Sequence, residues 1–162
     1  MGTGFFGKLP ASGDFVSRNL PTGLRRVLDK WLTDQIVPLT DRAQAWPHGG
    51  LRGVITLNDL PWVVLIEPSE DSVGRCYPLV ACAASNGTDL QGANRWADAV
   101  CSILFAGSDG ALDAETLAQD LDRIQGPMNA TDALVPPLIW WQNVPPDTPE
   151  HLLPRLRSLS SG

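Results

Sequence analysis

The sequence predicts a single α+β domain, in which a mainly antiparallel β-sheet is packed by α-helices. The expected elements run in the order strand, helix, three strands, two helices, strand. The connections between the consecutive strands are shorter than the roughly dozen residues that a parallel crossover needs, so they favour antiparallel pairing. The chain has 162 residues and 43% hydrophobic content, which is enough for one sizeable core.

The first segment is rich in glycine, proline, phenylalanine and charged residues. Residues 3–8 have strand character and residues 15–18 form a second extended piece, with turn-forming residues between them. We expect its three phenylalanines to be structural and to anchor the segment in the core: Phe5, Phe6 and Phe15.

Residues 22–46 are predicted to be helical, because apolar residues recur at steps of three and four with charged residues opposite. Pro38 is expected to end or kink this helix, leaving residues 39–46 as a short extension. Trp31 lies on the apolar stripe and is therefore expected in the core.

Three strands are predicted between residues 51 and 84. Residues 51–57 alternate as a half-buried strand should. Residues 62–66 are apolar on both faces, which is typical of a central strand, and we expect the helix over residues 93–105 to pack on it. Residues 75–84 form the third strand, in which Pro78 favours an edge position or a bulge.

After residue 84, residues typical of helix ends predict where the next two helices begin and end. Thr88 and Gln91 have the spacing of a capping box, and Gly107 is expected to end the helix that follows. Asp113 is a good N-cap for a second helix. Residues 138–141 read as the last strand.

The chain divides into a main domain and a tail. Residues 1–142 form the domain, and residues 143–162 are a proline-rich extension that packs on it or trails from it. Within the extension, Pro154 is expected to break a short apolar segment.

Composition excludes several classes of function. The net charge is -6 and the basic residues are scattered, which argues against a nucleic-acid or anionic-membrane surface. No apolar run approaches the roughly 18 residues of a membrane-spanning helix, and the N-terminal residues do not read as a signal peptide. We therefore expect a soluble, cytoplasmic protein.

Catalytic, metal and cofactor sites are not predicted. Residues 2–7 match G-x-G-x-x-G literally, but Pro10 follows where a nucleotide-binding helix should begin. The three cysteines are odd in number and lie among apolar residues, so we expect small buried thiols. The two histidines are expected in loops, and the acidic residues of the predicted turns pair with no histidine or second acid.

Two segments resemble a known family. Residues 4–21 read G-F-F-G-K-L-P-A-S-G-D-F-V-S-R-N-L-P, which resembles the N-terminal signature of the TagF (ImpM) family of type VI secretion-associated proteins. Residues 68–79 and the pair Trp140 and Trp141 fit the same family. The resemblance implies a non-enzymatic, post-translational repressor of type VI secretion that binds a protein of that machinery, with the forkhead-associated scaffold protein as the implied partner.

Four polar residues of these segments are the candidate partner-binding residues: Lys8, Asp14, Arg18 and Arg75. They could instead form internal ion pairs that orient the first segment against the third strand. An alternative function is a small hydrolase or transferase that uses Asp14 or Asp71 with a nearby arginine. The three interpretations differ in whether these side chains line a pocket, face a partner or are consumed by internal bonds.

Overall fold

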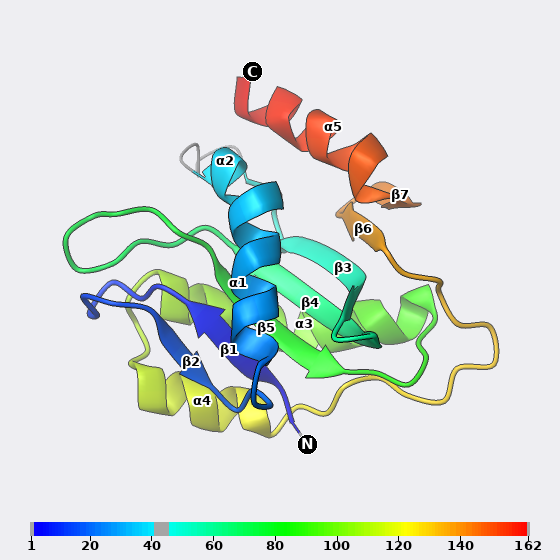
Figure 1. Cartoon of the computed structure of the whole chain (residues 1–162), viewed down its shortest axis with the longest axis horizontal. Coiled ribbons are helices and arrows are strands. Elements are labelled where there is room, and N and C mark those ends of the chain that lie inside the picture. Colours follow the sequence, from blue (N-terminus) through cyan, green and yellow to red (C-terminus); the bar gives the residue numbers. More distant parts are fainter. Residues whose placement is uncertain (1, 41–45, 162) are drawn as a thin grey trace.

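One antiparallel sheet organises the chain (Figure 1). The computed structural model describes residues 2–40 and 46–161. Within these residues, seven strands pair in the order β2-β1-β5-β4-β3-β6-β7, and every neighbouring pair is antiparallel. The strands are β1 (Gly4–Gly7), β2 (Val16–Arg18), β3 (Leu51–Leu57), β4 (Leu60–Glu67), β5 (Leu79–Ala84), β6 (Leu138–Trp141) and β7 (Val144–Asp147). The expected α+β class is confirmed.

Helices cover both faces of the sheet. In Figure 1, α1 crosses in front of the strands while α3 and α4 lie behind them, and α5 lies beside β6 and β7. The helices are α1 (Leu24–Gln35), α2 (Val37–Thr40), α3 (Leu90–Ser108), α4 (Ala114–Asp122) and α5 (Pro149–Ser161). The helix predicted over residues 22–46 therefore ends before Pro38, and residues 41–45 of its expected extension lie outside the described residues.

Strand β4 lies at the centre of the sheet, as its two apolar faces predict. Val64 faces the core shared with α1 and α5, whereas Val63 and Leu65 face the core shared with α3 and α4. Trp96 and Val100 of α3 are buried against this second face. The predicted packing of that helix on the central strand is confirmed.

The phenylalanines of the first segment anchor it on both faces of the sheet. Phe5 and Phe6 are fully buried and lie in different cores, because successive side chains of a strand point to opposite faces. Phe15 is half-buried and stacks on Phe6, with their ring centroids 5.7 Å apart. Tyr77 meets both rings edge-on.

The third strand departs from its prediction. It begins at Leu79, so Pro78 precedes it, and it lies between β1 and β4 rather than at an edge. The edge position expected for Pro78 is therefore wrong. A proline forces a strand to the edge of a sheet only when it lies within the strand, where it lacks the N–H for a ladder hydrogen bond, and Pro78 lies just outside β5. Residues 68–78 instead form a long loop between β4 and β5, closed by an isolated bridge between Glu70 and Cys76.

The ends of α3 also differ from those predicted. Asp89, not Thr88, caps the helix, and its carboxylate accepts a hydrogen bond from the Gly92 N–H. Gly107 does not end the helix but lies inside it. A side chain there would lie 2.9 Å from Cδ2 of Leu117, so this glycine allows α4 to approach α3 closely. The predicted cap of α4 at Asp113 is confirmed.

The C-terminal residues hold two elements that the sequence did not predict. A two-residue turn at Gln142 and Asn143 connects β6 to β7. Strand β7 tolerates two prolines because it lies at the edge of the sheet and pairs only with β6. Helix α5 continues through Pro154, so the expected break is wrong. Leu152 and Leu156 of this helix are buried in the same core as α1.

The cysteines and histidines correct two further predictions. Cys82 is buried, and burial raises the pKa of its thiol to about 12. Cys76 is exposed in the loop before β5 and Cys101 is half-buried, so the expectation of three buried thiols is wrong. His151 lies in α5 rather than in a loop, and its Nδ1 is 3.0 Å from Oδ1 of Asp147.

Candidate functional site

The two segments that carry the family resemblance lie side by side. We call residues 8–15 and 68–76 together the double loop; both parts extend to the left-hand side of Figure 1. The backbone N–H of Ser72 donates to the carbonyl of Ser12 at 2.8 Å, and the Ser69 hydroxyl donates to the Lys8 carbonyl at 2.7 Å. Residues far apart in the sequence thus form one surface unit.

Asp71 is the centre of the double loop. Its Oδ2 accepts hydrogen bonds from Lys8 Nζ at 2.9 Å and from Arg75 Nε at 2.7 Å. Its Oδ1 accepts from the backbone N–H groups of Val73 and Arg75, at 3.0 and 2.9 Å. The side chain has no exposed surface. Both carboxylate oxygens are therefore fully engaged inside the protein.

The ionised form of Asp71 is strongly favoured. Burial of the carboxyl by itself would raise its pKa, but the hydrogen bonds from Lys8, from the two backbone N–H groups and from the Arg75 side chain hold that pKa well below its usual range. Lys8 is itself buried, and its Nζ lies 5.0 Å from the centroid of the Phe15 ring. Asp71 and Lys8 consequently form a buried ion pair, in which the carboxyl of Asp71 stays ionised.

The tip of the double loop faces solvent. Val73 is 70% exposed, and Gly74 takes a positive φ of 83° that turns the chain back toward Arg75. The Arg75 side chain is 62% exposed although its Nε pairs with Asp71. Its Nη2 donates to the Gly13 carbonyl at 3.0 Å, which is a further hydrogen bond between the two loops.

Asp14 and Arg18 take different places. Asp14 is exposed in the double loop, where its Oδ1 accepts the backbone N–H of Phe15 at 2.7 Å. Arg18 lies on the edge strand β2 and pairs with Glu115 of α4, with Nη2 and Oε1 2.9 Å apart. The structure thus brings Lys8 and Arg75 together on Asp71, keeps Asp14 nearby in the chain, and places Arg18 in a separate ion pair.

Sequence reasoning treated Asp71 only as a possible catalyst and missed its central role. One local signal was available, because an Asp followed three residues later by Gly, as in Asp71 to Gly74, is typical of a turn whose carboxylate binds its own backbone. The contact with Lys8 has no such signal, since the two residues are 63 positions apart.

A second polar network was also missed. Arg52 of β3 pairs with Asp98 of α3 at 2.8 Å and donates to Oδ1 of Asn94 at 2.9 Å. The indole N–H of Trp140 donates to the same oxygen at 2.8 Å. These residues line a cavity of about 690 Å³ that extends to Pro146. Because every one of these polar atoms has a partner, the network connects α3 to the sheet.

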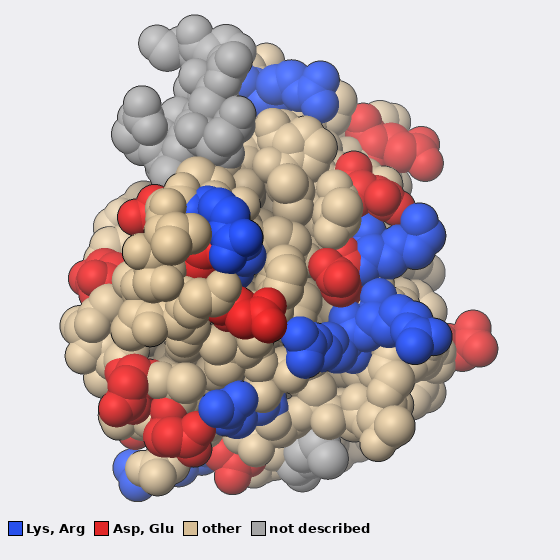
Figure 2. All heavy atoms as spheres, turned by 60° about the vertical axis from the view of Figure 1, so that its left-hand side comes forward, with Lys and Arg blue, Asp and Glu red and all other residues tan. Residues whose placement is uncertain are grey.

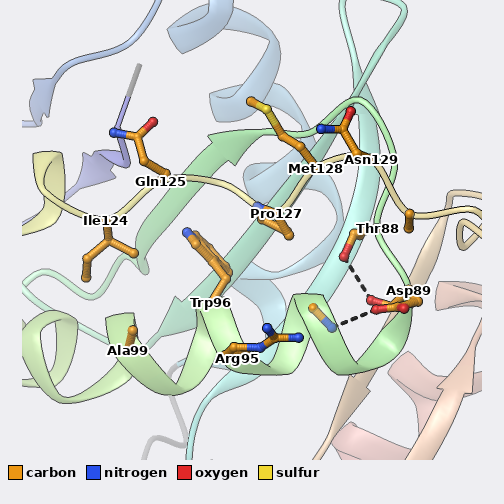
Figure 3. Close-up of a pocket in the computed structure, with 12 residues that line it drawn as sticks. Thr88, Asp89, Arg95, Trp96, Ala99, Ile124, Gln125, Pro127, Met128 and Asn129 are labelled. Atoms are coloured by element: carbon orange, nitrogen blue, oxygen red, sulfur yellow. Dashed lines mark hydrogen bonds between the residues drawn. The ribbon is translucent and has the colours of Figure 1, made fainter.

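Figure 3 shows a further cavity, of about 500 Å³, between the first half of α3 and residues 124–130. Trp96 and Arg95 reach it from the helix and Met128 from the facing segment. The carboxylate of Asp89 accepts the Gly92 N–H at the helix cap, and the Thr88 hydroxyl donates to the Asp89 backbone carbonyl, as the dashed lines show. The Trp96 indole donates to the hydroxyl of Thr3 at 3.0 Å.

Over residues 2–40 and 46–161, no group of three or more His, Cys, Asp or Glu side chains is placed to hold a metal ion. In the same ranges, no helix combines the length and the apolar character needed to cross a bilayer.

The face that carries the double loop has mixed charge. Figure 2 turns the left-hand side of Figure 1 toward the viewer and shows basic and acidic side chains close to one another. The net charge of -6 is therefore not spread evenly as an acidic surface. A partner that contacts this face meets both signs of charge.

Comparison with known proteins gives matches to solved structures and to a family model. The fold is similar to that in the crystal structure of PA0076 from Pseudomonas aeruginosa PAO1, with a TM-score of 0.62 and 22% sequence identity over 98% of this chain and 77% of that one. No curated protein matches the sequence. The sequence model of the TagF N-terminal domain, described as type VI secretion system-associated, matches residues 4–124. The chain therefore belongs to the TagF N-terminal domain family of type VI secretion-associated proteins.

Proposed function

We propose that this protein is a non-enzymatic regulator of the type VI secretion system, which represses secretion after translation by binding another protein of that machinery. Family membership supports the association with type VI secretion. The repressor role, the cytoplasmic location and the forkhead-associated scaffold as partner are what the family resemblance implies, and they form part of the proposal.

The observation that carries the proposal is the way Asp71 organises the double loop. A buried, fully hydrogen-bonded carboxylate holds two loops in one arrangement, while Val73 and Arg75 remain exposed at the tip. A surface that is held in place before binding loses less conformational entropy when a partner docks. An exposed apolar side chain next to an arginine is also a common composition of a binding surface.

The four candidate residues would then have different roles. Arg75 and Asp14 lie near each other, since Nη2 of Arg75 bonds the carbonyl of Gly13, and both present charged groups to a partner. Lys8 is buried and acts as a positioning residue, because its contact with Asp71 holds the double loop in place. Arg18 is outside this surface and contributes to binding only if the partner also covers β2 and α4.

The enzymatic alternative has little support from the geometry. A hydrolase or transferase based on Asp71 needs a carboxylate oxygen that can reach a substrate. Both oxygens of Asp71 already accept two hydrogen bonds each, and the side chain is inaccessible. Asp14 is accessible, and its Oδ1 accepts a hydrogen bond from the N–H of Phe15.

The proposal can be tested by affinity purification of the tagged protein from secretion-competent cells, combined with a secretion assay under overproduction. We expect the wild type to retain a component of the secretion machinery and to reduce secretion. Val73→Asp should lose both effects, because it places a charge on the exposed tip, whereas Arg26→Glu on the exposed face of α1 should keep them. Failure of the wild type to retain any such component would contradict the proposal.

A further inference from the structure

A cavity of about 590 Å³ opens beside the second half of α3. Its apolar lining includes Trp46, Pro68 and Phe105, and its polar lining includes Glu67, Ser102 and Ser108. The Trp46 indole donates to the Ile66 carbonyl at 3.0 Å, which fixes its ring. A site of this size with aromatic walls and few polar groups is typical of a ligand pocket.

Glu67 is the only acidic side chain on the described lining of this cavity. It is the last residue of β4 and is only 7% exposed. Its carboxyl has no hydrogen-bond or ion-pair partner among the residues that the structure describes. Most buried carboxylates are paired, so an unpaired one in the wall of a cavity indicates a place for a positive partner.

The cations and backbone around Glu67 are consistent with this interpretation. Burial raises the pKa of the carboxyl to about 7, and the charge of Arg52 lowers it only in part. Arg52 itself is committed to Asp98 and Asn94. Gly50 makes room for the carboxyl, because a Cβ at Gly50 would lie 2.7 Å from Oε1 of Glu67.

Phe105 also lines the cavity. Its side chain is 56% exposed, although the neighbouring apolar residue Leu104 is fully buried. An exposed phenylalanine beside a cavity with an unpaired acid suits a ligand that has both an apolar stem and a positive head. An aromatic ring also attracts a cation that lies over its face.

We propose that this cavity receives a lysine side chain of the protein partner, with the methylene stem against Trp46 and Phe105 and the ammonium against Glu67. The inference rests on the proposed function, in that the occupant is a protein. An ammonium has three donors, and the carboxylate of Glu67 can accept more than one of them. A guanidinium carries five donors and would leave more of them unpaired in an apolar pocket.

The first experiment uses N-acetyl-lysine N-methylamide as the probe and the full 162-residue chain. We expect it to shift the amide NMR signals of residues around the cavity, such as Ser102 and Phe105. The norleucine analogue, which keeps the stem and lacks the charge, should bind at least about tenfold more weakly. The arginine analogue should also bind more weakly than lysine.

The variants decide whether Glu67 is the contact. Glu67→Gln should lose the lysine-specific shifts, while Glu70→Gln, which removes an equal charge from the exposed loop nearby, should keep them. Phe105→Ala should weaken the probe without unfolding the protein, because that side chain is largely exposed. The inference is overturned if the probe does not bind, if Glu67→Gln binds it unchanged, or if norleucine binds equally well.

Partner capture separates this inference from the proposed function. If the wild type retains a secretion component and Glu67→Gln loses it, both stand. If the two proteins retain it equally, the lysine site is wrong and the proposed function stands. If the wild type retains none, the proposed function fails, and the probe experiment still decides whether the cavity binds a lysine side chain.

Discussion

The Nζ atom of Lys8 lies 2.9 Å from Oδ2 of Asp71 and joins two segments that are 63 residues apart in the chain. Lys8 follows β1 and Asp71 lies in the loop between β4 and β5, so the contact connects the first segment to the middle of the sheet. Neither side chain has much contact with water, and the buried ammonium of Lys8 is compensated by the carboxylate of Asp71, which also pairs with Arg75.

Removing the charge of Asp71 should destabilise the protein. Asp71→Asn leaves the ammonium of Lys8 buried without a counter-charge, which is among the most damaging classes of substitution. We expect the midpoint of thermal unfolding to fall by on the order of 10 °C. Asp14→Asn, a matched change at an exposed position in the same double loop, should alter it little. Equal melting of Asp71→Asn and wild type would show that the buried pair is not a structural anchor.

Stability should depend on pH through Glu67. Burial raises its folded-state pKa to about 7, above the ordinary value of 4.5, and Arg52 opposes this shift only in part. The folded state therefore binds more protons than the unfolded state between these values, and stability falls as pH rises from 4.5 through 7.

Glu67→Gln removes this penalty. At pH 8 the variant should be more stable than wild type by about 3 kcal/mol, and near pH 4 the difference should largely vanish. Urea unfolding at both pH values measures this, with Glu70→Gln as the exposed control. A constant difference between Glu67→Gln and wild type at all pH values would mean that the carboxyl does not titrate in this range.

Phe5 and Phe6 should each be essential to stability, although they face different cores. Replacing either by Ala removes a fully buried ring and should cost about 3–5 kcal/mol of unfolding free energy in denaturant melts. Phe15→Ala should cost less, because this ring is only half-buried. A Phe6→Ala protein that melts like wild type but loses partner binding would instead place Phe6 in an interface.

Charge reversal should separate Arg75 from Arg18. Arg75→Glu places a negative charge beside Asp71 at the exposed tip and should relieve repression of secretion. Arg18→Glu breaks an exposed ion pair with Glu115 and a local hydrogen bond to the Ser17 carbonyl, so its melting temperature should stay within a few degrees of wild type. Its effect on repression reports whether the partner also covers β2.

The effect of Arg75→Glu on repression has to be compared with the thermal unfolding of the same variant. Because most of its side chain faces solvent, we expect its melting to shift only modestly. Loss of repression with intact melting would assign Arg75 to the binding surface. A collapse of melting would assign it to the internal ion-pair network, and partner binding would have to be carried by other residues of the double loop.

Much of the fold could be predicted from local patterns. The alternation and apolar runs of residues 51–66 predicted two strands and the central position of β4. The apolar stripe of α3 predicted the face that packs on the sheet. Asp113 marked the start of α4 because a helix cap depends on residues close in sequence. These signals are local, and a single sequence contains them in full.

What only the tertiary structure decided depends on long-range neighbours. Pro78 could not be placed from the sequence, because its effect depends on whether the strand begins before or after it, and β1 supplies the neighbour that makes β5 internal. Strand β7 has four residues, two of them proline, so its sequence lacks the pattern that predicts a strand. It forms because the free edge of β6 is available for pairing.

The candidate site shows the same division. The sequence by itself determined that Lys8, Asp14, Arg18 and Arg75 belong to motifs of a type VI secretion-associated family. Only the folded chain decided which charges meet: it places Asp71 between two cations, and among the described residues it gives Glu67 no ion pair, only the more distant charge of Arg52. Ion pairing depends on distances of a few ångströms between side chains, and those distances arise only after the sheet has brought residues far apart in sequence together.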